Sequence, residues 1–113
     1  MRELLQSKIH KCTVTEANLS YIGSVTIDGD LLDKIDMWEG QKVLIVSNTS
    51  GSRLETYVIR GRSGSGVICI NGAAAHLIKT GEEVIIIGFQ FSETQISPRC
   101  ILVDKANKFV EFL

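Results

Sequence analysis

The sequence predicts a small, mainly β protein whose strands form a barrel. Short runs rich in Val, Ile and Leu recur along the chain, and turn-forming Gly, Asn, Asp and Ser separate them at close intervals. Aromatic residues make up only 6% of the 113 residues, against 44% hydrophobic residues in all, so aliphatic side chains must form the core. A chain of this length is expected to be a single domain with a substantial core.

The first half of the chain is expected to contain strands and one short helix. Asp30 is a candidate N-cap for a helix over residues 31–37, in which Leu31, Leu32 and Ile35 share one face. A turn is expected near 16–18. Apolar alternation predicts strands over residues 4–19 (one or two), 19–27, 43–47 and 54–60.

The second half continues the pattern of short strands. The apolar run VIIIGFQF is expected to be the most buried strand, and NGAAAHLIKTG a turn and a short helix that ends at Gly81. The segment GRSGSG at 61–66 matches neither a P-loop nor a dinucleotide fingerprint, so we expect a mobile hairpin connection. Strands are expected over 67–70, 84–91, 101–104 and 108–112.

Charge and cysteine content exclude several classes of protein. A net charge of −1, from 12 basic and 13 acidic residues, lacks the basic excess of a nucleic-acid or membrane-surface binder. No 18-residue apolar run or secretory signal is found, so a cytoplasmic location is expected. The three cysteines, Cys12, Cys69 and Cys100, are expected to be reduced thiols. A structural zinc is not expected, since only His10 and His76 could complete a ligand set.

The segment NGAAAH at 71–76 has two interpretations. Asn and Gly adopt left-handed backbone easily, and three alanines allow close approach of another chain or a ligand. The segment is either a helix start packed on the barrel or a row of backbone N–H groups that binds a small anion. His76 and Trp38 are interpreted as packing residues.

Two further groups of polar residues are candidates for a binding site. Lys8 and His10 lie two apart on a predicted strand and share a face, where most such pairs are simply solvated. Arg53, Thr56 and Tyr57 offer a carboxylate clamp, a hydroxyl donor and a phenolic acid. Because strands alternate, Thr56 and Tyr57 should point to opposite faces. They could then serve one pocket only between subunits or at a twist.

The stretch YIGSVTID at 21–28 alternates like a strand but carries Gly23 and Ser24 in its middle. Glycine inside a strand weakens it and usually marks a bulge or a close approach to the backbone. This position therefore needs a separate explanation.

Three motifs together resemble the pyruvoyl-dependent aspartate 1-decarboxylase (aspartate alpha-decarboxylase) family. They are Y-x-G-S at 21–24, R-x-x-T-Y at 53–57 and N-G-A-A-A-H at 71–76, and the similarity covers nearly the whole chain in order. The resemblance implies a six-stranded double-psi β-barrel with short helices. It also implies a homotetramer with active sites between subunits, and L-aspartate as substrate. The resemblance also allows a maturation factor as a partner. It implies no nucleic acid or membrane partner.

The resemblance implies that the single domain, residues 1–113, cleaves itself between Gly23 and Ser24. The products are a β chain, 1–23, and an α chain, 24–113. The Ser24 hydroxyl attacks the Gly23 carbonyl, the resulting ester eliminates, and the dehydroalanine left at residue 24 hydrolyses to a pyruvoyl group. Glycine is expected to leave the carbonyl open and to allow a strained backbone. Thr56 would donate a hydrogen bond to the oxyanion on Gly23, and Tyr21 would support this segment.

In the catalysis that the resemblance implies, the pyruvoyl group is the cofactor and no metal takes part. The group forms a Schiff base with L-aspartate and withdraws electrons as CO2 leaves. The product is β-alanine, a precursor of pantothenate and coenzyme A. Tyr57 would be the proton donor. The substrate-binding residues would be Arg53, Lys8, His10, Asn71, Gly72, Ala73 and Ala74.

Other functions remain open from the sequence. A barrel of this size also suits a non-processed binding or regulatory module, although Arg60 and Arg62 form only a short basic stretch for a DNA binder. A third interpretation is a relative that folds but never cleaves. The presence of Gly23, Ser24 and the other motif residues counts against it.

Overall fold

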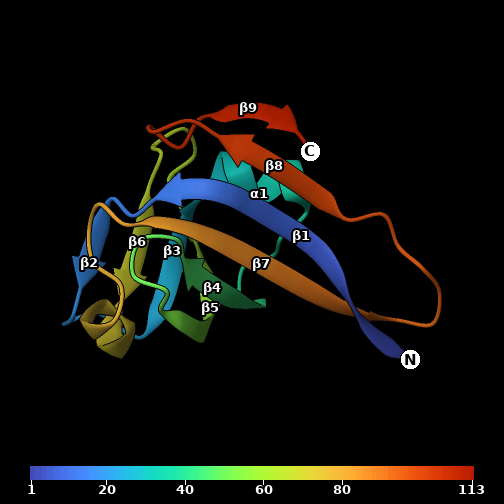
Figure 1. Ribbon diagram of the computed structural model, residues 1–113, viewed down its shortest axis with the longest axis horizontal. Coiled ribbons are helices and arrows are strands. Elements are labelled where there is room, and N and C mark those ends of the chain that lie inside the picture. Colours follow the sequence, from blue (N-terminus) through green and yellow to red (C-terminus); the bar gives the residue numbers. More distant parts are fainter.

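Nine β-strands form one continuous sheet in the computed structural model, which describes residues 1–113 (Figure 1). One α-helix and one short 3-10 helix accompany the sheet, so the mainly β prediction is confirmed. The elements are β1 (Arg2–Thr13), β2 (Glu16–Asn18), β3 (Ser24–Asp28), α1 (Gly29–Ile35), β4 (Lys42–Ser47), β5 (Arg53–Gly61), β6 (Ile68–Asn71), η1 (Gly72–His76), β7 (Glu83–Ser92), β8 (Arg99–Val103) and β9 (Phe109–Phe112).

The strand order contains two crossing connections of the same kind. The order is β2-β6-β3-β5-β4-β7-β1-β8-β9. Strand β3 therefore lies between β5 and β6, and β1 lies between β7 and β8, although each flanking pair is consecutive in the chain. Each connection must pass across the strand between its two ends. These two psi-shaped crossings confirm the double-psi arrangement. The sheet has nine strands where six were expected, and the short β2 and β9 form its two ends.

The N-terminal segment joins the two ends of the sheet. Strand β1 pairs with β7 and β8, and β2, which follows directly, pairs in parallel with β6. Between them, the Thr15 backbone N–H donates to the Ile68 carbonyl at 2.9 Å. Inside the closed sheet lies an aliphatic core, as the composition predicted. Its fully buried members include Ile9, Ile27, Ile45, Ile70 and Ile86.

The segment before β3 differs from the prediction. Residues 16–18 form strand β2, and the turn comes at 19–20, where the Asn18 side-chain oxygen accepts from the Ser20 N–H at 3.0 Å. Strand β3 begins only at Ser24, so Gly23 lies in a bend before the strand. Gly23 is also outside the left-handed region, and an added Cβ would meet nothing within 4 Å. The expectation of a strained glycine inside a strand is therefore wrong at this position.

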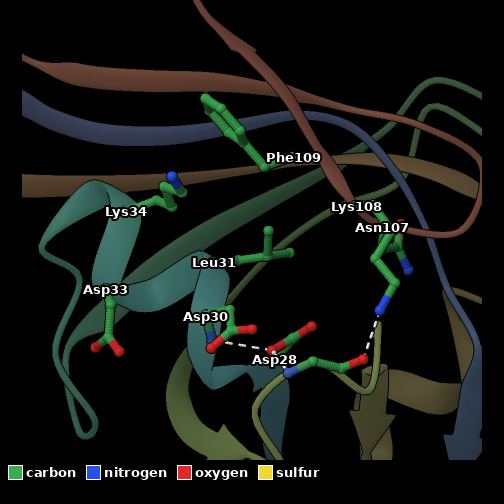
Figure 2. A pocket seen from close by; sticks show the side chains of 9 residues that line it. Asp28, Asp30, Leu31, Asp33, Lys34, Asn107, Lys108 and Phe109 are labelled. Atoms are coloured by element: carbon green, nitrogen blue, oxygen red, sulfur yellow. Dashed lines mark hydrogen bonds between the residues drawn. The ribbon is translucent and has the colours of Figure 1, made fainter.

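Asp28 organises the end of β3. It is the N-cap of α1, in place of the predicted Asp30, and its buried carboxylate accepts the Asp30 N–H at 2.9 Å (Figure 2). The same carboxylate accepts the N–H groups of Gly64 at 2.9 Å and Gly66 at 2.8 Å. The predicted mobile hairpin at 61–66 is therefore wrong. Strands β5 and β6 do not pair, and their connection is fixed by Asp28 as it crosses β3.

Replacing Asp28 by Ala should lower the free energy of unfolding by on the order of 3 kcal/mol, because three backbone N–H groups lose a charged acceptor. Urea unfolding measures this loss, with Ser24→Ala present in each protein so that chain cleavage does not interfere. Asp33→Ala, a change within the helix α1 that Asp28 caps, is the matched control. Its ion pair with Arg60 is exposed to solvent and should contribute little. Equal stabilities of the two variants would contradict the role given to Asp28.

Several smaller predictions are also wrong. Trp38 and His76 are exposed and not packed, and the Trp38 indole N–H donates to Asp36. The β7 strand is buried only at alternate positions, and Phe89 and Phe91 near its end are exposed. The predicted helix after Asn71 is the short 3-10 helix η1, which ends well before Gly81.

No helix in the structure has both the length and the apolar character needed to cross a membrane.

Candidate active site

The loop of residues 19–23, here called the β2–β3 loop, passes over the end of β6. Both strands that it connects pair with β6, and both Asn18 and Ser24 lie in register with Asn71. The residue after Asn71 is Gly72, which has a φ of +74°. A Cβ on Gly72 would lie 2.7 Å from the Gly23 Cα and 2.9 Å from the Gly23 N. Only glycine at 72 therefore allows the loop to lie this close to β6.

Ser24, the first residue of β3, is fully buried, and its hydroxyl both donates and accepts a hydrogen bond. Its hydroxyl donates to the Ile22 carbonyl at 2.8 Å and accepts from the Asn71 side-chain amide at 3.0 Å. A hydroxyl oxygen has two lone pairs, so one remains free. The same Asn71 nitrogen also donates to the Thr26 hydroxyl at 3.0 Å. The geometry thus fixes the Ser24 hydroxyl beside the backbone of the β2–β3 loop.

Tyr57 lies next to Ser24 on the neighbouring strand. The parallel ladder between β3 and β5 begins with the pair Val25 and Val58, both buried in the core. The preceding residues, Ser24 and Tyr57, therefore point to the opposite, outer face. Thr56 shares the inner face with Val58, opposite Val43 in the adjacent strand. Alternating exposure along β5 confirms that Thr56 and Tyr57 point to opposite faces, and no hydrogen bond joins Thr56 to Ser24 in the structure.

Arg53 lies on the same exposed face of β5 as Tyr57, four residues away. At the rise of a strand this corresponds to about 13 Å. Glu55, between them, pairs with the Lys42 ammonium at 2.8 Å. Arg53 makes no ion pair, so its guanidinium is free to bind an anion.

Lys8 and His10 share the outer face of β1, as predicted, because the alternate residues Ser7 and Ile9 are buried. Three strands separate β1 from β3 in the strand order, and no hydrogen bond joins Lys8 or His10 to Ser24 or Asn71. Burial lowers the pKa of His10, with a further lowering from nearby Lys8. Its Nδ1 atom is buried without a hydrogen-bond partner. Within one chain, the structure does not bring Lys8 and His10 to Ser24.

The segment 71–76 packs on the barrel, as one of the two sequence interpretations expects. Ala75 is buried in the core, whereas Ala73 is exposed and Ala74 is partly buried, so η1 packs on the barrel through one side. Asn71 precedes η1 but makes no side-chain cap. Its amide turns to Ser24 instead. Tyr21, in the β2–β3 loop, has a half-exposed side chain.

A cavity of about 420 Å³ lies beside α1, away from these residues (Figure 2). Asp28, Asp30 and Lys34 are among its lining side chains, and the Lys34 ammonium lies 4.2 Å from the centre of the Phe109 ring. The Asp28 carboxylate is already occupied by three backbone donors. We therefore attribute this cavity to the packing around α1. No cluster of three or more His, Cys, Asp or Glu side chains that could hold a metal ion is found.

Ser24, Thr26, Cys69 and Asn71 form a hydrogen-bonded group, here called the Ser24 cluster. Sequence reasoning missed two of its members. Thr26 and Cys69 are opposite each other in the β3–β6 ladder, directly beside the pair Ser24 and Asn71. The Cys69 thiol donates to the Asn71 side-chain oxygen at 3.1 Å. Their alternate positions in SVTID and ICIN were a usable signal, but only once the pairing of the two strands was known.

Comparison with known proteins gives a consistent result along the chain. The sequence model of a family described as aspartate decarboxylase matches residues 1–110. An aspartate 1-decarboxylase from Bacillus velezensis is 50% identical over 116 aligned positions, which cover 99% of this chain and 91% of that protein. Aspartate 1-decarboxylases from Bacillus cereus strain B4264 and Bacillus thuringiensis strain Al Hakam are each 49% identical with the same coverage.

Among solved structures, the barrel is similar to the computationally designed protein msDPBB_sym2. The TM-score is 0.50 and the sequence identity 15%, over 77% of this chain and 99% of the designed one. At this identity the similarity concerns the fold alone.

Proposed function

The chain belongs to the aspartate decarboxylase family, and on this basis we propose that it converts L-aspartate to β-alanine and CO2. β-Alanine made in this way feeds the synthesis of pantothenate and coenzyme A. The single observation that carries the proposal beyond family membership is the buried Ser24 hydroxyl, held by Asn71 beside the β2–β3 loop. A serine hydroxyl that is buried and held beside the backbone in this way suits a self-cleavage reaction.

The residues around Ser24 fit a small keto group made in place from this serine. Its oxygen already faces a hydrogen-bond donor, the Asn71 amide, and the absence of a side chain at Gly72 allows the backbone of Gly23, the residue to be cut off, to lie close by. When formed, a pyruvoyl group supplies an electrophilic carbon for the substrate amine and an electron sink for the loss of CO2. No residue of the cluster needs a metal to perform this chemistry.

We propose that the chain makes this group by cutting itself between Gly23 and Ser24. The Ser24 oxygen adds to the Gly23 carbonyl carbon, and its proton, which points to the Ile22 carbonyl before the reaction, is transferred to the nitrogen of residue 24 so that this nitrogen can leave as an amine. The C–N bond then breaks to leave an ester. Elimination across Cα and Cβ of residue 24 frees residues 1–23 with a carboxylate end. Hydrolysis then consumes one water and releases one ammonia. Tyr21 as a supporting residue is part of this proposal, and so is Thr56 as the oxyanion donor, although within one chain Thr56 points to the inner face of β5 and makes no hydrogen bond to Ser24.

In the decarboxylation step, the chain's own residues would bind the substrate and move one proton. Tyr57 lies beside Ser24 on the outer face and would protonate the carbon that loses CO2. Asn71 and the backbone of residues 72–74 would contact the substrate. Arg53 has an unpaired guanidinium and would bind a carboxylate of aspartate.

A second copy of the chain would complete the pocket. Lys8 and His10 lie on β1, which does not pair with β3, and Arg53 lies about 13 Å along β5 from Tyr57, so we infer that one chain does not gather them around one small substrate. The outer face between these residues carries the partly exposed aliphatic side chains of Leu44, Val46, Ile85 and Ile87. This partly exposed aliphatic face is suited to packing against another copy, and it supports our proposal of a homotetramer with active sites between subunits.

The test of the proposed function is the mass of the freshly purified protein under denaturing conditions, together with an assay for β-alanine. Self-cleavage should give residues 1–23 and a fragment 24–113 that is lighter than the simple hydrolysis product by one ammonia. The same sample should release CO2 from L-aspartate. A fragment with an intact serine at its N-terminus, or an uncut and inactive chain after prolonged warming, would refute the proposal.

Replacing Arg53 by Ala should reduce kcat/KM for L-aspartate by on the order of tenfold or more, because the substrate loses a charged hydrogen-bond partner. Most of the change should be in KM, since the ion pair with the substrate carboxylate forms on binding and Arg53 has no part in the proposed proton transfer. Steady-state kinetics with variable aspartate measure both constants. Arg62→Ala, at an exposed arginine in the β5–β6 connection, is the control and should leave them unchanged. A normal KM in Arg53→Ala would eliminate this role.

A further inference from the structure

We propose that Cys69 is a positioning residue that sets the orientation of the Asn71 amide and, through it, of the Ser24 hydroxyl. The inference rests on the proposed self-cleavage. Its basis is a chain of three hydrogen bonds that runs from Cys69 to the β2–β3 loop. The Cys69 thiol donates to the Asn71 oxygen, the Asn71 nitrogen donates to Ser24, and Ser24 donates to the Ile22 carbonyl.

Strand register places the four side chains of this cluster on one face. Cys69 and Asn71 are two residues apart on β6, and their partners on β3 are Thr26 and Ser24. Residues two apart on a strand point the same way, and directly paired residues are neighbours. The cluster is therefore held by the backbone ladder of β3 and β6. Its internal hydrogen bonds decide only which way each group points.

The direction of the hydrogen bonds follows from the Ile22 carbonyl. A carbonyl can only accept, so the Ser24 proton is committed to it and the Ser24 oxygen must accept from Asn71. The two protons of the Asn71 amide then go to Ser24 and Thr26. The Asn71 oxygen is left facing Cys69, the group that donates to it.

The opposite orientation of the amide would disrupt this arrangement. The Asn71 oxygen would face Ser24 and Thr26, and the Ser24 hydroxyl would turn to it and leave the Ile22 carbonyl. The amide nitrogen would face the sulfur, which is a weak acceptor. A thiol proton at 69 therefore favours the orientation in which Ser24 is directed to the β2–β3 loop.

The thiol keeps its proton at neutral pH. Cys69 is only 6% exposed, and this burial, with the charge of nearby Glu16 and the presence of its carboxylate as a second hydrogen-bond acceptor, raises the pKa of the thiol to about 11. A buried thiol of this kind is a poor nucleophile and a poor metal ligand. As a hydrogen-bond donor, however, it is permanently available.

The test compares Cys69→Ala, which removes the donor, with Cys69→Ser, which keeps one. Each purified chain is followed over time by denaturing mass spectrometry, and the rate of appearance of residues 24–113 is measured. We expect Cys69→Ala to slow cleavage by about tenfold and Cys69→Ser to stay within about threefold of the unaltered protein. Cys12→Ala is the matched control. Cys12 is also a buried thiol, but it donates to the Val84 carbonyl in the core, so this variant should be less stable yet cleave normally.

The outcomes separate this inference from the proposed function. If the unaltered chain cleaves and Cys69→Ala cleaves as fast, or if Ala and Ser slow it equally, the positioning role is wrong and the function stands. If the unaltered chain never cleaves, both are wrong. The Raman S–H band gives an independent check in uncut Ser24→Ala protein. The Cys69 band, identified by its loss in Cys69→Ser, should shift to the frequency of a free thiol in Asn71→Ala. A band that does not move would also overturn the inference.

Discussion

Ser24→Ala should yield a single uncut chain that produces no β-alanine above background. The variant lacks the oxygen that would add to the Gly23 carbonyl, and it lacks the leaving group needed afterwards. Its fold should persist, because Ala occupies the same space at the start of β3 and only two hydrogen bonds are lost. Denaturing mass spectrometry, a β-alanine assay and circular dichroism measure the three parts of this expectation.

Ser20→Ala provides the control for this experiment. Ser20 lies in the same β2–β3 loop but is exposed, and its backbone N–H, not its hydroxyl, bonds to Asn18. This variant should cleave like the unaltered protein. Production of β-alanine by the uncut Ser24→Ala chain would show that the activity does not need Ser24, and the mechanism would have to be abandoned.

Gly72→Ala should slow cleavage by on the order of a hundredfold, because the added Cβ would lie 2.7 Å from the Gly23 Cα and must displace the loop that is cut. A shift of roughly 1 Å is enough to remove the Ser24 hydroxyl from its geometry. The neighbouring atoms are backbone, which cannot rotate away as a flexible side chain would. The time course of the 24–113 fragment measures the effect.

The strain of a left-handed alanine must be separated from this clash. Gly51 has a φ of +78°, close to the +74° of Gly72, but a Cβ there would meet nothing within 4 Å. Gly51→Ala therefore carries the same backbone strain without the contact. It should lose a similar amount of stability and cleave at the normal rate. If the two variants slowed cleavage equally, general destabilisation and not the contact with Gly23 would be the cause.

Strand positions could be predicted from the sequence, but strand partners could not. Alternation of apolar residues predicted most strands to within a few residues, because a strand with one buried face must alternate. Exposure at Phe89 and Phe91 was not predictable in this way. Figure 1 shows β7 continuing beside β1 beyond the body of the barrel, where no second layer covers it. The burial of a strand depends on what packs against it, and a single strand's sequence does not contain that information.

The candidate site was likewise only partly predictable, because its contacts depend on which strands pair. The motifs identified Ser24 and Asn71 as members of one set, but their contact depends on the pairing of β3 with β6, which are 47 residues apart at this point. The sequence also suggested that Gly23 needed an unusual backbone. The structure assigns that requirement to Gly72, on the other side of the contact. Only the register of the two strands could reveal which glycine was constrained.

The position of β1 between β7 and β8 determines what happens to residues 1–23 after the proposed cut. Strand β1 contributes Ile9 and Cys12 to the core and is hydrogen-bonded along both edges, and Val14, directly after the strand, is also a core residue. The short fragment therefore should not dissociate from the folded protein. Once both pieces are unfolded, however, refolding becomes a second-order reaction that slows on dilution. The uncut chain can return to its fold alone, whereas the mature protein should denature irreversibly at low concentration.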